Sequence, residues 1–395
     1  MATVPRPDRD TLRRLSEVDA GGGSVLSVYV NLDPSEFATA DARASAIGSA
    51  VNAAAQAVED DERELSHDQR IALREDVELV RDYLESADFG GTEGVAVFAA
   101  GHADLFEALQ LPFPVDNAVV VDAAPHVAPL TFQSEGDWYV ALVNRADARF
   151  LRGGPQGLTE EGRVSDDVHG QHDQGGWSQA RYERSVDREA DEHVRALLDT
   201  LRRLHERRGF DHLLVVAGPE VWAWVEHGLH AELREIFAGR VDADIPGASP
   251  EEVLAVVRPE MHRVREQHER ELLARLEERL GRGERAAAGL QPTLDALLQG
   301  RVETLLLLDG LAASGVVCAG CGWMGADPDT AACPVDGERP ERRDDIVEAA
   351  IASALGQDAD VVRIVGDDPP AEGQGPPARV LQLQGHGSIA ALLRF

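Results

Sequence analysis

The most informative stretch of the sequence reads Gly175-Gly176-Trp177-Ser178-Gln179-Ala180-Arg181-Tyr182. It lies between a polar segment, 153–174, that we expect to be a loop, and a helix that we expect over 178–208. The paired glycines allow positive φ angles and a close approach of the backbone to a ligand. Ser178 can cap the helix, whose first N–H groups suit a phosphate. Gln179 can orient a water molecule but cannot act as a base.

The helix that follows this stretch is rich in arginine. Arg181, Arg184, Arg188 and Arg195 share one helical face. Eight arginines and seven acidic residues lie between 181 and 208, in a chain whose net charge is -33. The helix is therefore a candidate RNA contact. Two simpler interpretations stay open, namely a glycine-rich helix start without function and a helix held by its own ion pairs.

The composition restricts the class of protein. A chain of 395 residues is expected to form two to three domains. No stretch is apolar and long enough to span a bilayer and no signal-type segment opens the chain, so we expect a soluble, cytoplasmic protein without membrane contact. All 38 basic residues are arginine, and the acidic balance argues against a general nucleic-acid binder. RNA contacts must then be local.

The first segment, 1–134, is predicted to be an α/β domain with a helical hairpin. Apolar spacing of three and four residues indicates its helices, and alternating or continuous apolar runs indicate its strands. Helices are expected over 10–18, 39–60 and 66–86, and strands over 24–30, 94–99, 105–111 and 118–122.

Two further segments, 135–262 and 263–395, also combine strands and helices. The central one has a strand pair at 139–143 and 148–151, a strand at 213–217 and a helix at 221–237, which indicates a mainly parallel or mixed sheet. The last one is predicted to have helices at 259–280, 292–298 and 344–355 and strands at 303–308, 361–364 and 380–383. The whole chain is thus expected to form three α/β domains.

A cysteine element at 316–340 indicates a metal site. Cys318 and Cys321 form one Cys-x-x-Cys turn, and Cys333 and Asp336 form a second with aspartate in the fourth position. Zinc prefers four tetrahedral ligands in such turns, so the four residues predict a structural zinc ion or a site that has lost its zinc. No organic cofactor is expected. A weaker metal pattern around His169 and His172 also fits an ordinary polar loop.

Three segments together resemble the archaeo-eukaryotic class-1 release factor superfamily. They are 23–30, the glycine-rich stretch at 175–182, and Gly385-His386-Gly387-Ser388 with the residues to Phe395. They occur in the order of that family and span essentially the whole chain. The resemblance implies three α/β domains, with a catalytic loop in the central one and a ribosomal-protein, kink-turn-binding type of fold in the last, where archaeal members carry a zinc ribbon.

The resemblance also implies roles for the residues of the loop. In termination factors the loop reads Gly-Gly-Gln, whereas Trp177 and Ser178 here separate the glycines from the glutamine, as in peptidyl-tRNA hydrolases of ribosome quality control. Gln179 would then position the water, Gly175 and Gly176 would admit the backbone, and Ser178 would belong to the same catalytic loop. Its RNA-binding residues would be Trp177, Arg181, Arg184 and Arg188.

The expected partners are the ribosome, the 3′ end of a tRNA and ribosomal RNA. The codon-reading Asn-Ile-Lys-Ser helix of termination factors has no counterpart, because the chain contains no lysine. Hydrolysis of peptidyl-tRNA on stalled or split ribosomes is therefore the leading hypothesis. The alternative is a non-catalytic hibernation or rescue factor in the A site. Delivery by a translational GTPase stays open.

Overall fold

The computed structural model describes most of the chain. The described residues are 7, 9–18, 23–34, 36–60, 66–131, 137–144, 147–155, 157–165, 194–207, 209–245, 247–366 and 375–395. They form a mixed α/β fold with four sheets. The chain divides into two compact units, one made of Met1–Ser134 with Glu269–Phe395 and the other of Glu135–His268. The division into three domains remains a prediction.

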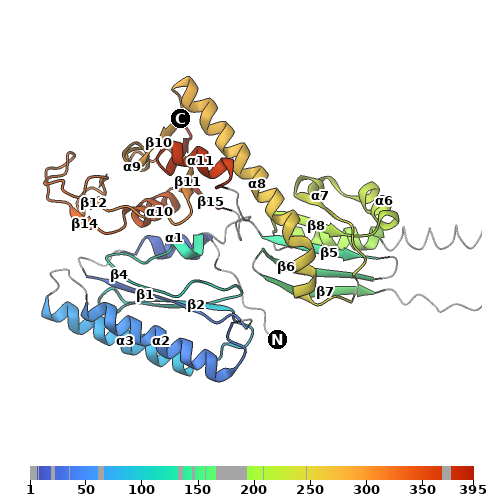
Figure 1. The fold of residues 1–395 in the computed structure, drawn as a ribbon, viewed down its shortest axis with the longest axis horizontal. Coiled ribbons are helices and arrows are strands. Elements are labelled where there is room, and N and C mark those ends of the chain that lie inside the picture. Colours follow the sequence, from blue (N-terminus) through green and yellow to red (C-terminus); the bar gives the residue numbers. More distant parts are fainter. Residues whose placement is uncertain are drawn as a thin grey trace, which may run out of the picture. The chain divides into compact units, whose positions relative to one another are not determined.

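The N-terminal part of the first unit is an antiparallel sheet in the order β3-β2-β1-β4, with helices on both faces (Figure 1). Its elements are α1 (Arg9–Ser16), β1 (Val25–Asn31), α2 (Ala40–Glu59), α3 (His67–Ser86), β2 (Gly94–Ala100), the 3-10 helix Gly101–Ala103, β3 (Leu105–Leu111), β4 (Ala118–Asp122) and α4 (Ala128–Thr131). The helices α2 and α3 cover one face because Val51, Leu73 and Val77 pack on Val28 and Val97. The predicted helical hairpin is confirmed.

The C-terminal part of the same unit is a second sheet, in the order β10-β16-β11-β15. Its elements are the end of α8 (Pro250–Arg282), β10 (Ala286–Ala288), α9 (Leu290–Leu298), β11 (Val302–Leu308), α10 (Ile346–Gly356), β15 (Asp360–Ile364), α11 (Ala378–Gly385) and β16 (Ile389–Leu393). The strands β11 and β15 are parallel, and the other pairs are antiparallel. The N-terminal and C-terminal parts share one hydrophobic core, in which Leu15 and Phe98 belong to the same cluster as Leu294 and Ile351.

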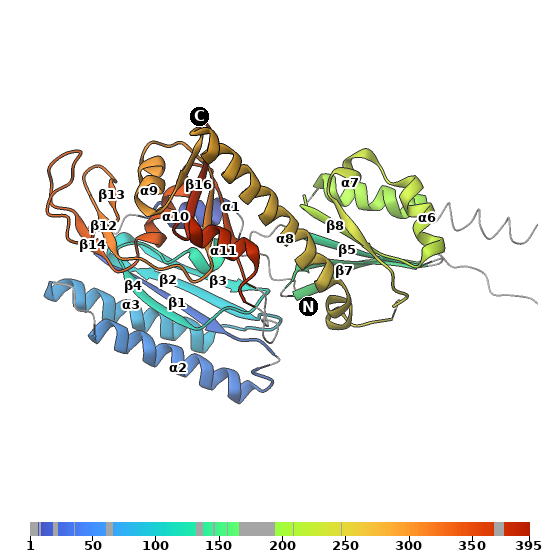
Figure 2. The same cartoon turned by 45° about the horizontal axis from the view of Figure 1, so that its top comes forward.

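The cysteine element forms a separate small sheet in the order β13-β12-β14. It consists of β12 (Gly315–Val317), β13 (Met324–Gly325) and β14 (Glu341–Arg343). Figure 2 shows this sheet beside α9. Arg343 Nη1 lies 2.8 Å from Asp122 Oδ1 at the end of β4, so the small sheet is tied to the N-terminal part.

The second unit is a five-stranded mixed sheet in the order β7-β6-β5-β8-β9. Its elements are β5 (Trp138–Val143), β6 (Asp147–Gly154), β7 (Gly157–Ser165), a helix described over 194–207, β8 (His212–Val216), α6 (Pro219–Gly228), α7 (Ala231–Glu235), β9 (Phe237–Val241) and the beginning of α8. The helix at 194–207 packs with α6 and α7 on one face, and α8 packs on the other. The predicted mixed sheet is present.

Four predicted elements are wrong in type or extent. Residues 157–165 form the strand β7 rather than a loop, because their backbone pairs with β6 although few side chains are apolar. The helix predicted over 221–237 is divided into α6 and α7 and followed by β9. The run at 380–383 belongs to the helix α11, and the last strand is β16. Helix α8 starts at Pro250, not at Pro259, because Ser249 and Glu252 form a capping box ahead of Pro259.

Among the residues that the structure describes, no helix has the length and apolarity needed to cross a membrane.

Candidate functional site

The structure brings the three cysteines and Asp336 together. One ligand atom from each of Cys318, Cys321, Cys333 and Asp336 lies within 4.8 Å of the other three. The sulfur atoms of Cys321 and Cys333 are 3.5 Å apart, and Cys318 Sγ is 3.2 Å from Asp336 Oδ2. The four residues predicted from the sequence therefore form one cluster.

The first half of the cluster is a tight turn between β12 and β13. The N–H of Cys318 donates to Trp323 O at 2.8 Å, and the N–H of Gly322 donates to Cys318 O at 2.8 Å. Gly322 has a φ of 73°, which glycine adopts at little cost. The turn directs the side chains of Cys318 and Cys321 toward the same point.

The second half repeats this hydrogen-bond pattern. The N–H of Cys333 donates to Glu338 O at 2.7 Å, and the N–H of Gly337 donates to Cys333 O at 2.9 Å. Gly337 has a φ of 80°. Asp336 therefore occupies the place in this turn that Cys321 occupies in the first. Its carboxylate also accepts the N–H of Glu338 at 3.0 Å.

The four residues fit a tetrahedral metal ion. Bonds of about 2.3 Å from zinc to sulfur place two sulfur ligands about 3.8 Å apart, close to the 3.5 Å between the sulfur atoms of Cys321 and Cys333. Desolvation is the largest cause that raises the pKa of Cys318, and it raises that of Cys321 to about 12. The pKa of Asp336 is lowered, first by the N–H of Glu338 and then by the thiols. Four protein ligands leave no open position, so a bound ion would be structural.

The predicted catalytic and RNA-binding residues lie outside the described part of the chain. They are Gly175, Gly176, Trp177, Ser178, Gln179, Arg181, Arg184 and Arg188. The described residues show which elements flank the segment that contains these residues. The strand β7 ends at Ser165 before it, and the helix at 194–207 follows it.

Both ends of that segment belong to one edge of the central sheet. The strands β5, β8 and β9 are parallel, and β7 runs in the same direction because it is antiparallel to β6, which is antiparallel to β5. Ser165 therefore lies at the carboxyl edge of these strands. The helix at 194–207 packs on the sheet through Val194 and Leu201, and the chain passes from its carboxyl end to the amino end of β8. The amino end of the helix therefore lies toward the same carboxyl edge as Ser165. Ligands of open α/β sheets bind at this edge.

A buried arginine supports this edge and was not anticipated from the sequence. Arg149 is 7% exposed, its Nη1 donates to Ala248 O at 2.7 Å, and its Nε lies 3.1 Å from Glu160 Oε2. The hydrogen bond from Arg149 is the largest cause that lowers the pKa of Glu160. Only the polar character of β7 could have indicated such a partner. Because both charges are engaged, the pair stabilises the sheet rather than offering a free ligand.

A sequence match to a known family lies mainly in the central unit. Residues 125–262 match the model of a family described as "Bacterial archaeo-eukaryotic release factor family 10". The similarity to this release-factor family is limited to that segment of the chain. The predicted loop at 175–179 lies inside the matched release-factor segment, whereas the cysteine cluster lies outside it.

Solved structures of release-factor-like proteins are also similar to this chain. An archaeal translation termination factor, aRF1, is 18% identical, with 99% of each chain covered and a TM-score of 0.25. Pelota from Archaeoglobus fulgidus is 14% identical, with 100% of this chain and 94% of that chain covered and a TM-score of 0.34. Dom34 from S. cerevisiae is 9% identical over 76% of this chain and 79% of that chain, with a TM-score of 0.39. No curated protein matches the sequence.

Proposed function

We propose that this protein acts on the ribosome and hydrolyses peptidyl-tRNA on stalled or split ribosomes through the loop at 175–179. One observation carries the proposal. The glycine-rich loop lies within the release-factor match, and its segment is held at both ends by the carboxyl edge of the central sheet. That edge is where an open α/β sheet presents a ligand-binding loop.

Each loop residue has a separate role in the proposed reaction. Gly175 and Gly176 let the backbone approach the tRNA end, and Gln179 holds a water molecule against the peptidyl ester. Because the glutamine amide is not a base, the barrier falls through positioning and through stabilisation of the developing oxyanion. Arg184 and Arg188 hold RNA phosphates with their guanidinium groups.

The rest of the chain has a supporting role in this proposal. Residues 1–134, 135–262 and 263–395 act as three functional domains, the last of the kink-turn-binding type. Cys318, Cys321, Cys333 and Asp336 would hold a structural zinc ion, which supports the fold of the small sheet and takes no part in the chemistry.

A non-catalytic function is the second candidate. Trp177 and Ser178 separate the glycines from Gln179. This insertion changes where the glutamine amide lies relative to the backbone. Such a loop can occupy the A site of an idle ribosome without hydrolysing the ester, which is the expected behaviour of a hibernation or rescue factor.

Substitution of Gln179 separates the two functions. With peptidyl-tRNA bound to ribosomes, the wild-type protein should release peptide, and Gln179→Ala should slow release by more than about tenfold, or about 1.4 kcal/mol in the barrier. Gln174→Ala, in the same segment, serves as the control and should release at the wild-type rate. Equal rates for Gln179→Ala and the wild type would contradict the hydrolase. Absence of release by a protein that still co-sediments with ribosomes would favour the second function.

A further inference from the structure

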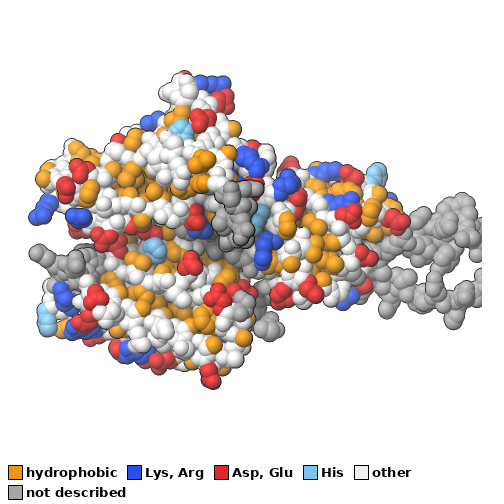
Figure 3. All heavy atoms as spheres, in the orientation of Figure 1, with side chains coloured by type: hydrophobic (Ala, Val, Ile, Leu, Met, Phe, Trp, Pro, Cys, Tyr) orange, Lys and Arg blue, Asp and Glu red, His pale blue; other side chains and the backbone are white. Residues whose placement is uncertain are grey.

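The end of α8 forms a hollow of about 210 Å³ that is lined only by charged residues, here called the arginine hollow. Its lining residues are Arg275, Glu278, Arg279, Arg282, Glu284 and Arg285. Four of the six are arginines in a chain whose net charge is -33. Figure 3 shows basic and acidic side chains next to one another at this end of α8.

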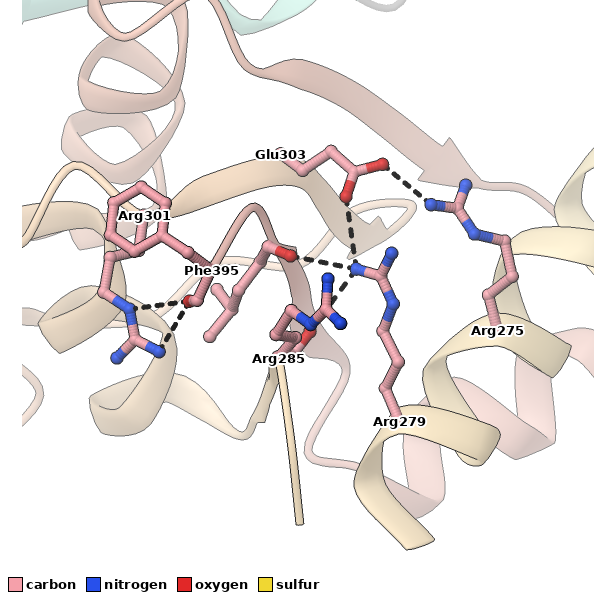
Figure 4. Close-up of polar contacts among 7 residues, drawn as sticks. Arg275, Arg279, Arg285, Arg301, Glu303 and Phe395 are labelled. Atoms are coloured by element: carbon pink, nitrogen blue, oxygen red, sulfur yellow. Dashed lines mark hydrogen bonds and ion pairs between the residues drawn. The ribbon is translucent and has the colours of Figure 1, made fainter. Parts of the chain in front are cut away.

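Local structure explains how these arginines meet. Arg275, Arg279 and Arg282 follow one another at helical spacing of four and three residues, so they share a face of α8. Gly283, with a φ of 67°, ends the helix and turns the chain toward β10, which brings Arg285 beside them. Arg279 Nη1 also donates to Leu393 O at 3.0 Å, which ties the hollow to β16 (Figure 4).

Two acids are already engaged by arginines of the hollow. Glu303 Oε1 lies 2.7 Å from Arg275 Nη2, and Glu303 Oε2 lies 3.1 Å from Arg279 Nη1 (Figure 4). Burial alone would raise the pKa of Glu303, but the hydrogen bonds from the two arginines outweigh it and lower the pKa. Glu278 is 2.6 Å from Arg282. The single carboxylate of Glu303 thus faces two guanidinium groups, and the three side chains together keep one net positive charge.

Arg285 differs from the other three arginines. Its side chain is exposed and has no acidic partner among the residues that the structure describes. Its φ is 49°, a left-handed conformation that glycine adopts at lower cost. The backbone is held there because Arg285 O accepts the N–H of Leu393 at 2.9 Å. An unpaired guanidinium therefore stands at a position where the backbone favours glycine.

We propose that the arginine hollow binds the phosphates of an RNA backbone, as a contact separate from the loop at 175–179. The inference rests on the proposed function, because the ribosome would be the source of the RNA. Guanidinium groups bind phosphate oxygens in pairs, which suits a site whose basic residues are all arginine and outnumber Glu278 and Glu284 in its lining. Because no apolar side chain lines the hollow, it suits a charged backbone better than a base or an apolar peptide.

The test measures RNA binding by the full chain without ribosomes. The probe is a fluorescein-labelled single-stranded RNA of about 20 nucleotides, titrated by anisotropy at several salt concentrations. The double variant Arg282→Gln with Arg285→Gln should bind about fivefold or more weakly, and the slope of log K against log salt should fall by about 1 to 2. Both side chains are exposed, so circular dichroism should match that of the wild type.

A matched control lies on the same helix. Arg263 is 58% exposed and lies 2.7 Å from Glu260, much as Arg282 is 68% exposed and lies 2.6 Å from Glu278. Arg263→Gln should therefore bind the RNA as the wild type does. Glu303→Gln should bind RNA about twofold or more tightly, because it releases two arginines from their shared acid.

Three results would overturn the inference. The first is a double variant that binds RNA with the affinity and salt slope of the wild type. The second is an equal loss of RNA affinity in Arg263→Gln. The third is binding of an acidic peptide instead of RNA through Arg282 and Arg285. Gln179→Ala should bind the RNA probe normally whatever its rate of peptide release. A failure of the catalytic proposal is thereby distinguishable from a failure of this one.

Discussion

At the scale of single residues, the cysteine cluster differs from a four-cysteine zinc site by one ligand. Asp336 stands where the repeated turn would place a fourth sulfur, and its carboxylate oxygen is 3.2 Å from Cys318 Sγ. Zinc accepts carboxylate oxygen as well as thiolate, so the substitution does not by itself abolish binding. It removes one soft ligand from the set, and the remaining affinity depends on Cys318, Cys321 and Cys333.

Metal analysis tests this assignment. Protein prepared with ample zinc should hold about one equivalent, and Cys333→Ser should lose it because only three ligands remain. Asp336→Cys should retain zinc and resist a chelator for longer, while Asp329→Asn, in the exposed turn nearby, should match the wild type. Less than about a tenth of an equivalent in the wild type would refute an occupied zinc site.

Residue spacing predicted this cluster but not the arginine contacts. The turns at Cys318 and Cys333 are local, so their residues meet wherever the segment lies. Arg149 and Arg285 acquire their surroundings from Ala248 and Leu393, which are far away in the sequence. No local pattern predicts a contact of that kind.

At the scale of elements, amphipathic helices were predicted well and polar or short elements were not. The helices α2 and α3 differ from their predicted bounds by no more than one residue at either end. The strand β7 was not predicted because Leu158 is its one buried apolar side chain among those described, and its pairing with β6 depends on the backbone. The run at 380–383 is too short to distinguish a strand from a turn of helix by its pattern.

The pairing of β7 with β6 leads to a prediction about pH. The folded-state pKa of Glu160 is lowered from its ordinary value of 4.5, so its contribution to stability is present above that value and is lost as the pH falls below it. At neutral pH, Glu160→Gln should lower the free energy of unfolding by on the order of 1 kcal/mol, because Arg149 loses its partner. Urea denaturation at neutral and acidic pH measures this.

The expected difference in the free energy of unfolding between Glu160→Gln and the wild type disappears as the pH falls through the folded-state pKa of Glu160. Glu206→Gln provides the control, since Glu206 is 54% exposed and pairs with Arg202 on the surface. Its effect should be only a few tenths of a kcal/mol. A destabilisation by Glu160→Gln that stays constant with pH would show that the ion pair is not its cause.

At the scale of the whole molecule, the chain forms a continuous unit and a discontinuous one. The clusters of the central unit draw their buried residues from 138–261, whereas the other unit needs both ends of the chain. The predicted α/β character of the three segments is confirmed by the sheets. The shared core of Leu15, Phe98, Leu294 and Ile351 was not predictable from the sequence. The pattern around each residue indicates that its side chain is buried, but not which distant element it packs against.

An isolated fragment tests the independence of the central unit. Residues 137–268 should fold alone and unfold cooperatively in urea, because the two apolar faces of their sheet are covered by helices of the same segment. Circular dichroism and the denaturation curve measure this. A fragment without a cooperative transition would show that the unit depends on the remainder of the chain.

The central claim concerns where the glycine-rich loop acts. A density map of the full protein bound to a ribosome that carries peptidyl-tRNA measures this directly. The proposed function predicts that residues 175–179 reach the 3′ end of the tRNA, with the Gln179 amide within about 3.5 Å of the ester or of a water molecule between them. A bound protein whose loop lies away from the tRNA end would contradict it.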